Sequence, residues 1–275
     1  MSKVQILGDI YVVDGHPAEV RDFTPGLSAE VYYEVVRMIN GKFLFLEDHL
    51  KRLEHSLEAS GLSTPGKEAI RESLRVLQRS NAFKEGNIRI CIQIDSGREQ
   101  QLFCYFIPYM YPEVCTYKSG VQVMTYPHVR RNPGIKKWDD RFRSAVSQFI
   151  RETGSYEAIL LNRRHEVTEG SRSNLFFIDP GGQLVSAPET EILPGITRQY
   201  LLDICRTEKL KVVHRPIPLK ELEQFDSCFL SGTSPKVLPV WKLNGVIYEV
   251  NHPILKMLME RFDRVILQHL EDLRQ

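Results

Sequence analysis

The segment from residue 156 to residue 198 most constrains the fold and function of this chain. Two apolar, strand-like runs, Ala158–Leu161 and Asn174–Ile178, flank a polar turn, and a Pro-Gly-Gly sequence closes the second run. The turn between them contains Glu169, followed by a glycine and a serine. A carboxylate between strands that enter a core loses hydration unless a cation lies against it. Glu169 is therefore a candidate partner of a buried cation.

The same segment ends in a candidate anion site. Its last residues, Leu193-Pro194-Gly195-Ile196-Thr197-Arg198, run directly into a helical pattern that continues to Cys205. A helix start opened by glycine and threonine presents backbone N–H groups that suit a phosphate. A carboxylate that needs a cation and a helix start that needs an anion together indicate pyridoxal 5'-phosphate, which carries a pyridinium nitrogen and a phosphate.

Five short motifs occur along the chain in a consistent order. They are GIK (134–136), YEAILL (156–161), VTEGSRSNLF (167–176), ILPGITR (192–198) and SGTSPKVLPV (231–240). Together they resemble the class IV (fold-type IV) pyridoxal-phosphate-dependent aminotransferases, a family that includes branched-chain and D-amino acid aminotransferases and aminodeoxychorismate lyase. The resemblance covers nearly the whole chain, and several motifs that agree at once are a specific signal.

The pattern of strands and helices predicts an α+β protein with two domains. Residues 1–115 form a smaller N-terminal α+β domain, residues 116–120 a linker, and residues 121–275 a larger, cofactor-binding domain. Within the first domain, hairpin turns are expected at Gly8-Asp9 and at Asn40-Gly41. A β-barrel-like core with helices in the larger domain, as in D-amino acid aminotransferase, is what the resemblance implies.

Composition excludes several classes of partner. The net charge is +1 and the pI is about 7.7, so nothing favours a nucleic acid or an anionic membrane. The five cysteines show no metal-binding spacing, and no metal site is expected. The N-terminus lacks a signal-peptide pattern, and no apolar run could span a bilayer, which predicts a cytoplasmic protein. The resemblance implies a homodimer that binds small amino acid and keto acid substrates.

The resemblance also assigns roles to residues. Lys136 matches the lysine that links the cofactor covalently and moves the substrate proton, whereas a solvated lysine pair with Lys137 is the alternative. Glu169 matches the acid that pairs with the pyridine nitrogen, and Glu166 is by comparison a solvated acid. The remaining cofactor contacts are four phosphate ligands and one residue that packs on the ring, for which capping, surface charge or core packing is the alternative. They are Arg52, Ile196, Thr197 and Thr233 for the phosphate, and Leu193 for the ring.

Substrate binding is the least determined part of the sequence. Tyr33 and Arg89 match positions of the branched-chain pocket, although Asn87 and Ser28 stand where that pocket has tyrosines. An arginine is expected to fix the substrate α-carboxylate. The candidates are Arg89, Arg130, Arg131 and Arg172. Arg141 lies near the position of the tyrosine that, in branched-chain enzymes, contacts the phenolic oxygen of the cofactor, so this contact has no clear candidate.

The leading hypothesis is an amino acid aminotransferase, with a branched-chain amino acid as donor and 2-oxoglutarate as acceptor. A D-amino acid aminotransferase and an aminodeoxychorismate lyase, which would release pyruvate with the same lysine, are alternatives on the same fold. A relative that binds cofactor or a partner without turnover is a third class. Fold alone does not separate these functions.

Overall fold

A computed structural model of the chain describes residues 5–23 and 30–273. Ser28, one of the predicted substrate-pocket positions, lies outside the described residues. The chain divides into two compact units. The N-terminal unit comprises residues 1–110, 135–140 and 269–275, and the C-terminal unit comprises residues 111–134 and 141–268.

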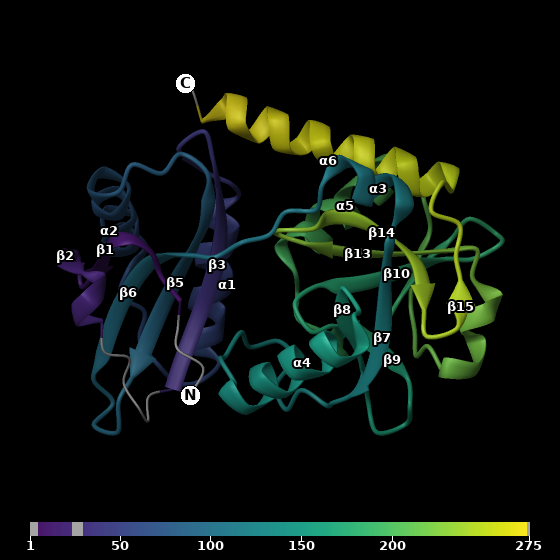
Figure 1. The fold of residues 1–275 in the computed structure, drawn as a ribbon, viewed down its shortest axis with the longest axis horizontal. Helices are drawn as coiled ribbons and strands as arrows, with labels where there is room; N and C mark the ends of the chain where they lie inside the picture. Colours follow the sequence, from purple (N-terminus) through teal and green to yellow (C-terminus); the bar gives the residue numbers. More distant parts are fainter. Residues whose placement is uncertain (1–4, 24–29, 274–275) are drawn as a thin grey trace. The chain divides into compact units, whose positions relative to one another are not determined.

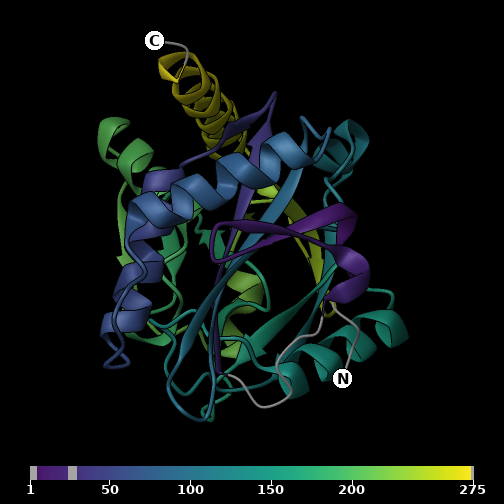
Figure 2. The same ribbon diagram turned by 90° about the vertical axis from the view of Figure 1, so that its left-hand side faces the viewer.

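The N-terminal unit is built on a six-stranded antiparallel sheet with the strand order β2-β1-β6-β5-β3-β4. Helices α1 and α2 cover one face of this sheet, and Figure 2 shows α2 crossing its strands. The elements are β1 (Leu7–Val13), β2 (His16–Glu19), η1 (Val20–Asp22), β3 (Glu30–Ile39), β4 (Lys42–Phe43), α1 (Leu46–Glu58), α2 (Lys67–Ser80), β5 (Gly86–Ile94) and β6 (Gln100–Ile107).

Alternation along the strands gives the two faces different compositions. On β3, Tyr32, Val36 and Met38 point into the apolar core under the helices. Tyr33 points to the opposite face, where it packs with aromatic residues of β1 and β6. This aromatic face also carries Arg89, because Arg89 lies in register with Tyr105 on β6 and with Val35 on β3.

The first hairpin prediction was wrong. Strand β1 continues through Gly8 and Asp9, and the chain reverses at Asp14-Gly15, where φ is +48° and +83°. Gly8 is not part of a turn. It allows the side chain of Asn81 to pack against the backbone, because a Cβ at position 8 would lie 2.4 Å from Oδ1 of Asn81. The second hairpin, at Asn40-Gly41 between β3 and β4, is confirmed.

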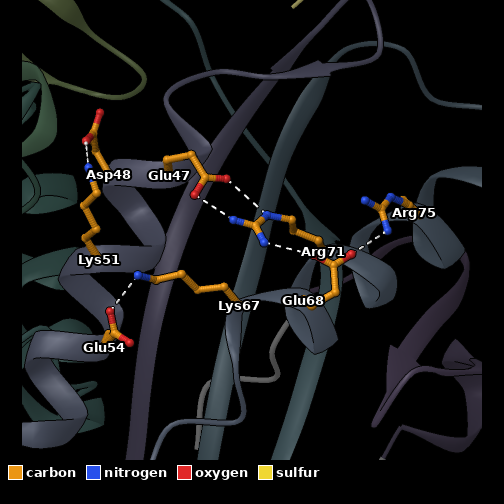
Figure 3. Close-up of polar contacts among 8 residues, drawn as sticks. All are labelled: Glu47, Asp48, Lys51, Glu54, Lys67, Glu68, Arg71 and Arg75. Carbon is orange, nitrogen blue, oxygen red and sulfur yellow. Dashed lines mark hydrogen bonds and ion pairs between the residues drawn. The ribbon is translucent and has the colours of Figure 1, made fainter.

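An exposed network of ion pairs joins α1 to α2 (Figure 3). The Arg71 guanidinium contacts Glu47 of α1 at 2.8 Å and Glu68 of its own helix at 3.0 Å. Lys67 contacts Glu54 at 2.8 Å. Exposed pairs of this kind contribute roughly 0.2–1 kcal/mol each, so the apolar core beneath the helices dominates the docking of α1 and α2.

The C-terminal unit contains a nine-stranded mixed sheet with the order β12-β11-β10-β13-β14-β7-β8-β9, and β15 pairs with β14. The sheet curls into a half-barrel (Figure 1), which confirms the expected architecture of this part of the chain. Its strands are β7 (Val121–Pro127), β8 (Glu157–Leu161), β9 (Val167–Gly170), β10 (Asn174–Ile178), β11 (Leu184–Ser186), β12 (Val212–His214), β13 (Ser227–Gly232), β14 (Lys236–Leu243) and β15 (Val246–Ile247). The helices are α3 (Val114–Ser119), α4 (Asp140–Thr153), η2 (Glu189–Glu191), α5 (Ile196–Thr207), η3 (Leu219–Gln224) and α6 (Pro253–Asp272).

The division into units differs from the predicted domain boundaries in two places. Helix α3 occupies most of the expected linker. The segment 135–140, expected in the larger domain, groups with the N-terminal unit because its backbone bonds to β3: Tyr33 N donates to Lys136 O at 3.2 Å, and Trp138 N donates to Val31 O at 2.8 Å. Along the described residues, no helix has both the length and the apolar composition needed to cross a bilayer.

Candidate active site

Glu169 lies near the end of β9 in the C-terminal unit, and it is 2% exposed. Its Oε2 accepts hydrogen bonds from the backbone N–H of Leu193 at 3.0 Å and from the amide of Asn174 at 3.3 Å. Its Oε1 lies 2.6 Å from Nε of Arg130, in an ion pair whose N–H direction falls outside hydrogen-bond geometry. The carboxylate is therefore held in place on Oε2, while Oε1 faces a cation.

The turn after Glu169 is fixed by a second buried carboxylate, Glu157. Glu157 accepts hydrogen bonds from the hydroxyls of Ser171 at 3.0 Å and Ser173 at 2.9 Å, and from the backbone N–H of Arg172. Gly170 is required here because a Cβ would lie 2.3 Å from Oγ of Ser173. Three donors offset the cost of burying the Glu157 charge, and the turn gains a defined conformation.

The carbonyl oxygen of Ser171 in this turn receives two arginines. Arg130 Nη2 donates to it at 3.1 Å and Arg143 Nη1 at 3.0 Å. Arg130 is thus held both by the turn and by Glu169. Glu157 therefore acts on Glu169 indirectly. It fixes the turn at Ser171, and the carbonyl oxygen of Ser171 orients Arg130, the cation that faces Glu169.

The helix start predicted as an anion site is bonded into the same cluster. Asn174, which donates to Glu169, also donates to Leu193 O at 2.8 Å. Gly195, the N-cap of α5, lies so close to this amide that a Cβ would be 2.0 Å from Asn174 Oδ1. No side chain in the described part of the chain caps α5, and Ile196 and Thr197 in its first turn are buried. Uncapped N–H groups at a buried helix start fit a phosphate.

The SGTS turn between β13 and β14 adds hydroxyls beside this cluster. Ser231 pairs in register with Asn174, and α5 packs against β13. Oγ of Ser231 is buried without a hydrogen-bond partner among the described residues. A buried hydroxyl without a partner costs about 1–3 kcal/mol, which an added acceptor would offset. Thr233 lies two residues further, in the turn. The C-terminal unit therefore fits a ligand that has both a cationic nitrogen and a phosphate.

Lys136 lies in the N-terminal unit on the segment that pairs with β3. Its backbone N–H donates to Oγ of Ser56 on α1 at 3.2 Å, and its Nζ lies 4.9 Å from the centroid of the Tyr33 ring. Lys137 instead forms an ion pair with the exposed Glu30 at 2.9 Å. The two lysines therefore occupy different environments, and Lys136 is the one beside a candidate pocket residue.

Arg52 of α1 is buried in an ion pair with Glu34 of β3. Arg52 Nε donates to Oε1 and Nη2 donates to Oε2, both at 2.7 Å, and His49 Nδ1 lies 2.8 Å from Oε2. Burial alone would raise the pKa of Glu34, but the charge and hydrogen bonds of Arg52, with the hydrogen bond from His49, hold it well below its ordinary value. Burial lowers the pKa of His49 despite the attraction of Glu34. A phosphate role for Arg52 remains a prediction, and two of its N–H groups are used by Glu34.

Arg89 lies on the aromatic face of the sheet. Its guanidinium carbon is 4.4 Å from the centroid of the Trp138 ring, 5.6 Å from that of Tyr33 and 6.0 Å from that of Tyr105. Arg89 and Tyr33, predicted together as substrate-binding residues, thus lie together in the structure.

Other predicted positions lie on the surface. Arg131, Arg141 and Arg172 are exposed, whereas Arg130 is half-buried against Glu169. Four buried polar residues that organise the candidate regions of the two units were not predicted from the sequence: Glu34 in the N-terminal unit, and Glu157, Asn174 and Ser231 in the C-terminal unit. For Glu34 a signal existed, because a carboxylate alternates there with apolar residues on the strand face toward α1.

Comparisons with known proteins agree on one family. The family model described as amino-transferase class IV matches residues 32–243. The chain is 28% identical over 224 residues to a D-alanine aminotransferase of Bacillus licheniformis, covering 78% of each chain. It is 27% identical over 271 residues to a putative branched-chain-amino-acid aminotransferase of Methanocaldococcus jannaschii, covering 91% of this chain and 92% of the relative.

A solved structure shows the same fold. The branched-chain aminotransferase from the archaeon Thermoproteus uzoniensis with norvaline superposes with a TM-score of 0.82 at 24% identity, covering 96% of each chain. The family match spans most of the chain, and the buried carboxylate and uncapped helix start fit the cofactor that this family uses. The chain therefore belongs to the class IV aminotransferases, a family of pyridoxal-phosphate-dependent enzymes.

Proposed function

We propose that this enzyme transfers an amino group between an apolar, branched-chain L-amino acid and the dicarboxylic keto acid 2-oxoglutarate. The observation that carries the proposal is Arg89, a guanidinium surrounded by the rings of Tyr33, Tyr105 and Trp138. The rings suit an apolar side chain, and the guanidinium suits the second carboxylate of the acceptor. One pocket can then accept both substrates in turn.

Roles in the reaction are assigned within each unit. When bound, pyridoxal phosphate supplies an electron-accepting ring that acidifies the Cα–H bond of the substrate. In the N-terminal unit, Lys136 is assigned as the residue that removes and returns the proton at the substrate α-carbon, and Arg52 as a phosphate ligand. In the C-terminal unit, Oε1 of Glu169 would hold a proton on the ring nitrogen.

The other cofactor contacts belong to the C-terminal unit. Backbone N–H groups of Ile196 and Thr197 would bind phosphate oxygens at the start of α5, and Thr233 would add a hydroxyl. Leu193 would pack on the ring, and its backbone N–H already orients Glu169. Arg130 faces the same carboxylate oxygen that is assigned to the ring nitrogen.

The experiment is a panel of single half-reactions, each monitored through the absorption spectrum of the bound cofactor. L-Leucine, L-isoleucine and L-glutamate are expected to convert the cofactor to its amino form, and 2-oxoglutarate to reverse the change. Conversion by D-alanine but by none of the L-amino acids would replace the proposal with a D-amino acid aminotransferase, the activity named for the Bacillus licheniformis relative. Pyruvate release from aminodeoxychorismate without conversion by any amino acid would replace it with the lyase.

A homodimer is proposed as the active form. The face of the N-terminal sheet that carries Tyr33 also has Val31 and Val35, which are only partly buried within one chain, and partly exposed apolar strand positions of this kind are common in subunit contacts. Sedimentation equilibrium is expected to give twice the chain mass of 31.8 kDa. A fully active monomer would refute this part of the proposal.

A further inference from the structure

The half-buried Arg89 has an incomplete set of partners. The Tyr105 hydroxyl is one hydrogen-bond partner. Nε is buried without an acceptor among the described residues, and no carboxylate in that part of the chain pairs with this arginine within 4.0 Å. A half-buried charge with a buried, unpaired Nε is costly unless an anion joins it. Of the three aromatic rings around the guanidinium carbon, that of Trp138 has the nearest centroid, at 4.4 Å.

Trp138 is anchored independently of Arg89. Its backbone N–H donates to Val31 O at 2.8 Å, and its indole Nε1 donates to Oδ1 of Asp140 at 2.8 Å. Its ring meets Tyr33 edge to face, with centroids 5.3 Å apart and an interplanar angle of 79°. The backbone bond thus places the residue on the segment beside β3, and the Nε1 bond and the contact with Tyr33 restrain the plane of the indole before any ligand binds.

A fixed aromatic ring restrains a guanidinium while leaving it able to donate. The ring attracts the delocalised charge through its face, whereas the N–H groups of arginine lie in the guanidinium plane and point away from a stacked ring. Lysine at the same place would keep the charge but would lose both the planar stacking and the paired donors.

We propose that Trp138 is a positioning residue that holds the Arg89 guanidinium ready to receive a ligand carboxylate through its in-plane N–H groups. The inference rests on the proposed function only for naming the ligand as an amino or keto acid. The carboxylate belongs either to the distal end of a dicarboxylic substrate or to the α-position of any amino acid. Trp138 is two residues from Lys136, so the same backbone segment carries the assigned catalytic amine and the ring that orients Arg89.

Titration calorimetry of the purified full-length protein with glutarate tests this, at constant ionic strength. Glutarate has two carboxylates and no amino or keto group, so its binding does not require turnover. Trp138→Leu is expected to weaken glutarate binding roughly five- to thirty-fold, and Trp138→Phe by less, as expected for the loss or weakening of a cation–π contact. Arg89→Gln should abolish binding, and Arg89→Lys should weaken it markedly. Arg98→Gln, which removes an exposed charge after β5, is the matched control and should bind like wild type.

The fluorescence of Trp138 is a second readout, which shows whether the ligand binds beside this residue. The chain has two tryptophans, so Trp241→Phe leaves Trp138 as the fluorescent reporter. Saturable quenching by glutarate in this background, lost with Arg89→Gln, is the expected result. Wild-type glutarate affinity in both Trp138 variants would overturn the positioning role, and wild-type affinity in Arg89→Gln would overturn the carboxylate site. Binding of 4-methylpentanoate at the same strength would assign the site to an α-carboxylate, and a preference for glutarate would assign it to a distal one.

An inactive protein that still binds glutarate through Arg89 and Trp138 would refute the proposed aminotransferase without touching this inference. If the protein is an active aminotransferase and its glutarate affinity is unchanged by substitution of Arg89 and Trp138, the proposed function stands and this inference is refuted. Thermal unfolding followed by circular dichroism identifies variants that fail to fold, and Trp138→Phe keeps the test available if Trp138→Leu is one of them.

Discussion

Replacement of Glu34 by glutamine should destabilise the N-terminal unit strongly. The carboxylate is fully buried and receives two hydrogen bonds from Arg52 and one from His49. Glutamine can still accept at most two of these three bonds, the two that end on Oε2, through its carbonyl oxygen, and neither keeps an anionic acceptor. The charge-assisted bond from Arg52 Nε to Oε1 is lost, at about 1.5–3 kcal/mol, and Arg52 becomes a buried cation without its anion.

The expected loss in the free energy of unfolding is about 3–5 kcal/mol, the range seen when one member of a buried ion pair is removed. Urea denaturation followed by circular dichroism measures it. Glu54→Gln is the matched control, because Glu54 forms a partly exposed ion pair with Lys67 and its loss should cost less than about 1 kcal/mol.

Addition of pyridoxal phosphate to the Glu34→Gln protein then tests the assignment of Arg52 as a phosphate ligand. If Arg52 contacts the phosphate of the cofactor, pyridoxal phosphate should stabilise the Glu34→Gln protein by more than it stabilises wild type, because the bound anion takes the place of the missing carboxylate. A variant as stable as wild type would show that the buried pair is not needed for folding. Equal stabilisation of both proteins by pyridoxal phosphate would remove Arg52 from the phosphate ligands.

Three further predictions concern the cofactor residues and the buried histidine. Lys136→Ala should abolish the visible absorption of the lysine-linked cofactor while Lys137→Ala keeps it, because Lys137 is engaged with Glu30; the opposite pattern in the two spectra would exchange the roles. Glu169→Gln should lower kcat on the order of 10²–10³-fold, with a smaller change in cofactor affinity because the phosphate contacts remain; wild-type kcat would refute the ring-nitrogen assignment. Folding stability should fall below about pH 6.5, by up to about 1.4 kcal/mol per pH unit, because the folded protein holds the pKa of His49 below its ordinary value and the unfolded chain takes up the proton first. His49→Gln should flatten the urea-midpoint profile between pH 7 and pH 5, and an unchanged slope would contradict this reasoning.

Local signals in the sequence located the turn at Asn40-Gly41 and the helix that begins after Gly195. Asn40-Gly41 was predicted as a turn because both residues tolerate positive φ, and both adopt it. The same rule misplaced the first hairpin. Both candidate turns pair a glycine with an aspartate, Gly8-Asp9 and Asp14-Gly15. What distinguishes them is a tertiary contact: the side chain of Asn81 lies against Gly8, so this glycine is needed for close packing and not for a turn. That contact joins residues far apart in the sequence, which no local pattern encodes.

Glu169 illustrates how far sequence reasoning about the site could go. Its position between two strands predicted a buried carboxylate that needs a cation, and it is buried and faces Arg130. The sequence predicted Arg130 only as one of four candidates for the substrate α-carboxylate and not as a partner of Glu169, because that pairing depends on where the turn at Ser171 places its carbonyl oxygen. That placement is set by Glu157, on a strand whose apolar neighbours gave no reason to expect a carboxylate with three donors.

Asn174 explains why the two features first recognised in the sequence occur on one scaffold. The carboxylate and the helix start were inferred separately, one from burial and one from uncapped N–H groups. In the structure a single side-chain amide donates both to Glu169 and to Leu193 O, and it lies against Gly195 at the start of α5. Any side chain at position 195 would push this amide away and loosen the carboxylate together with the helix start. The glycine in the LPGITR motif is thus explained by the packing of Asn174, and the geometry for a cationic nitrogen and the geometry for a phosphate are mechanically coupled.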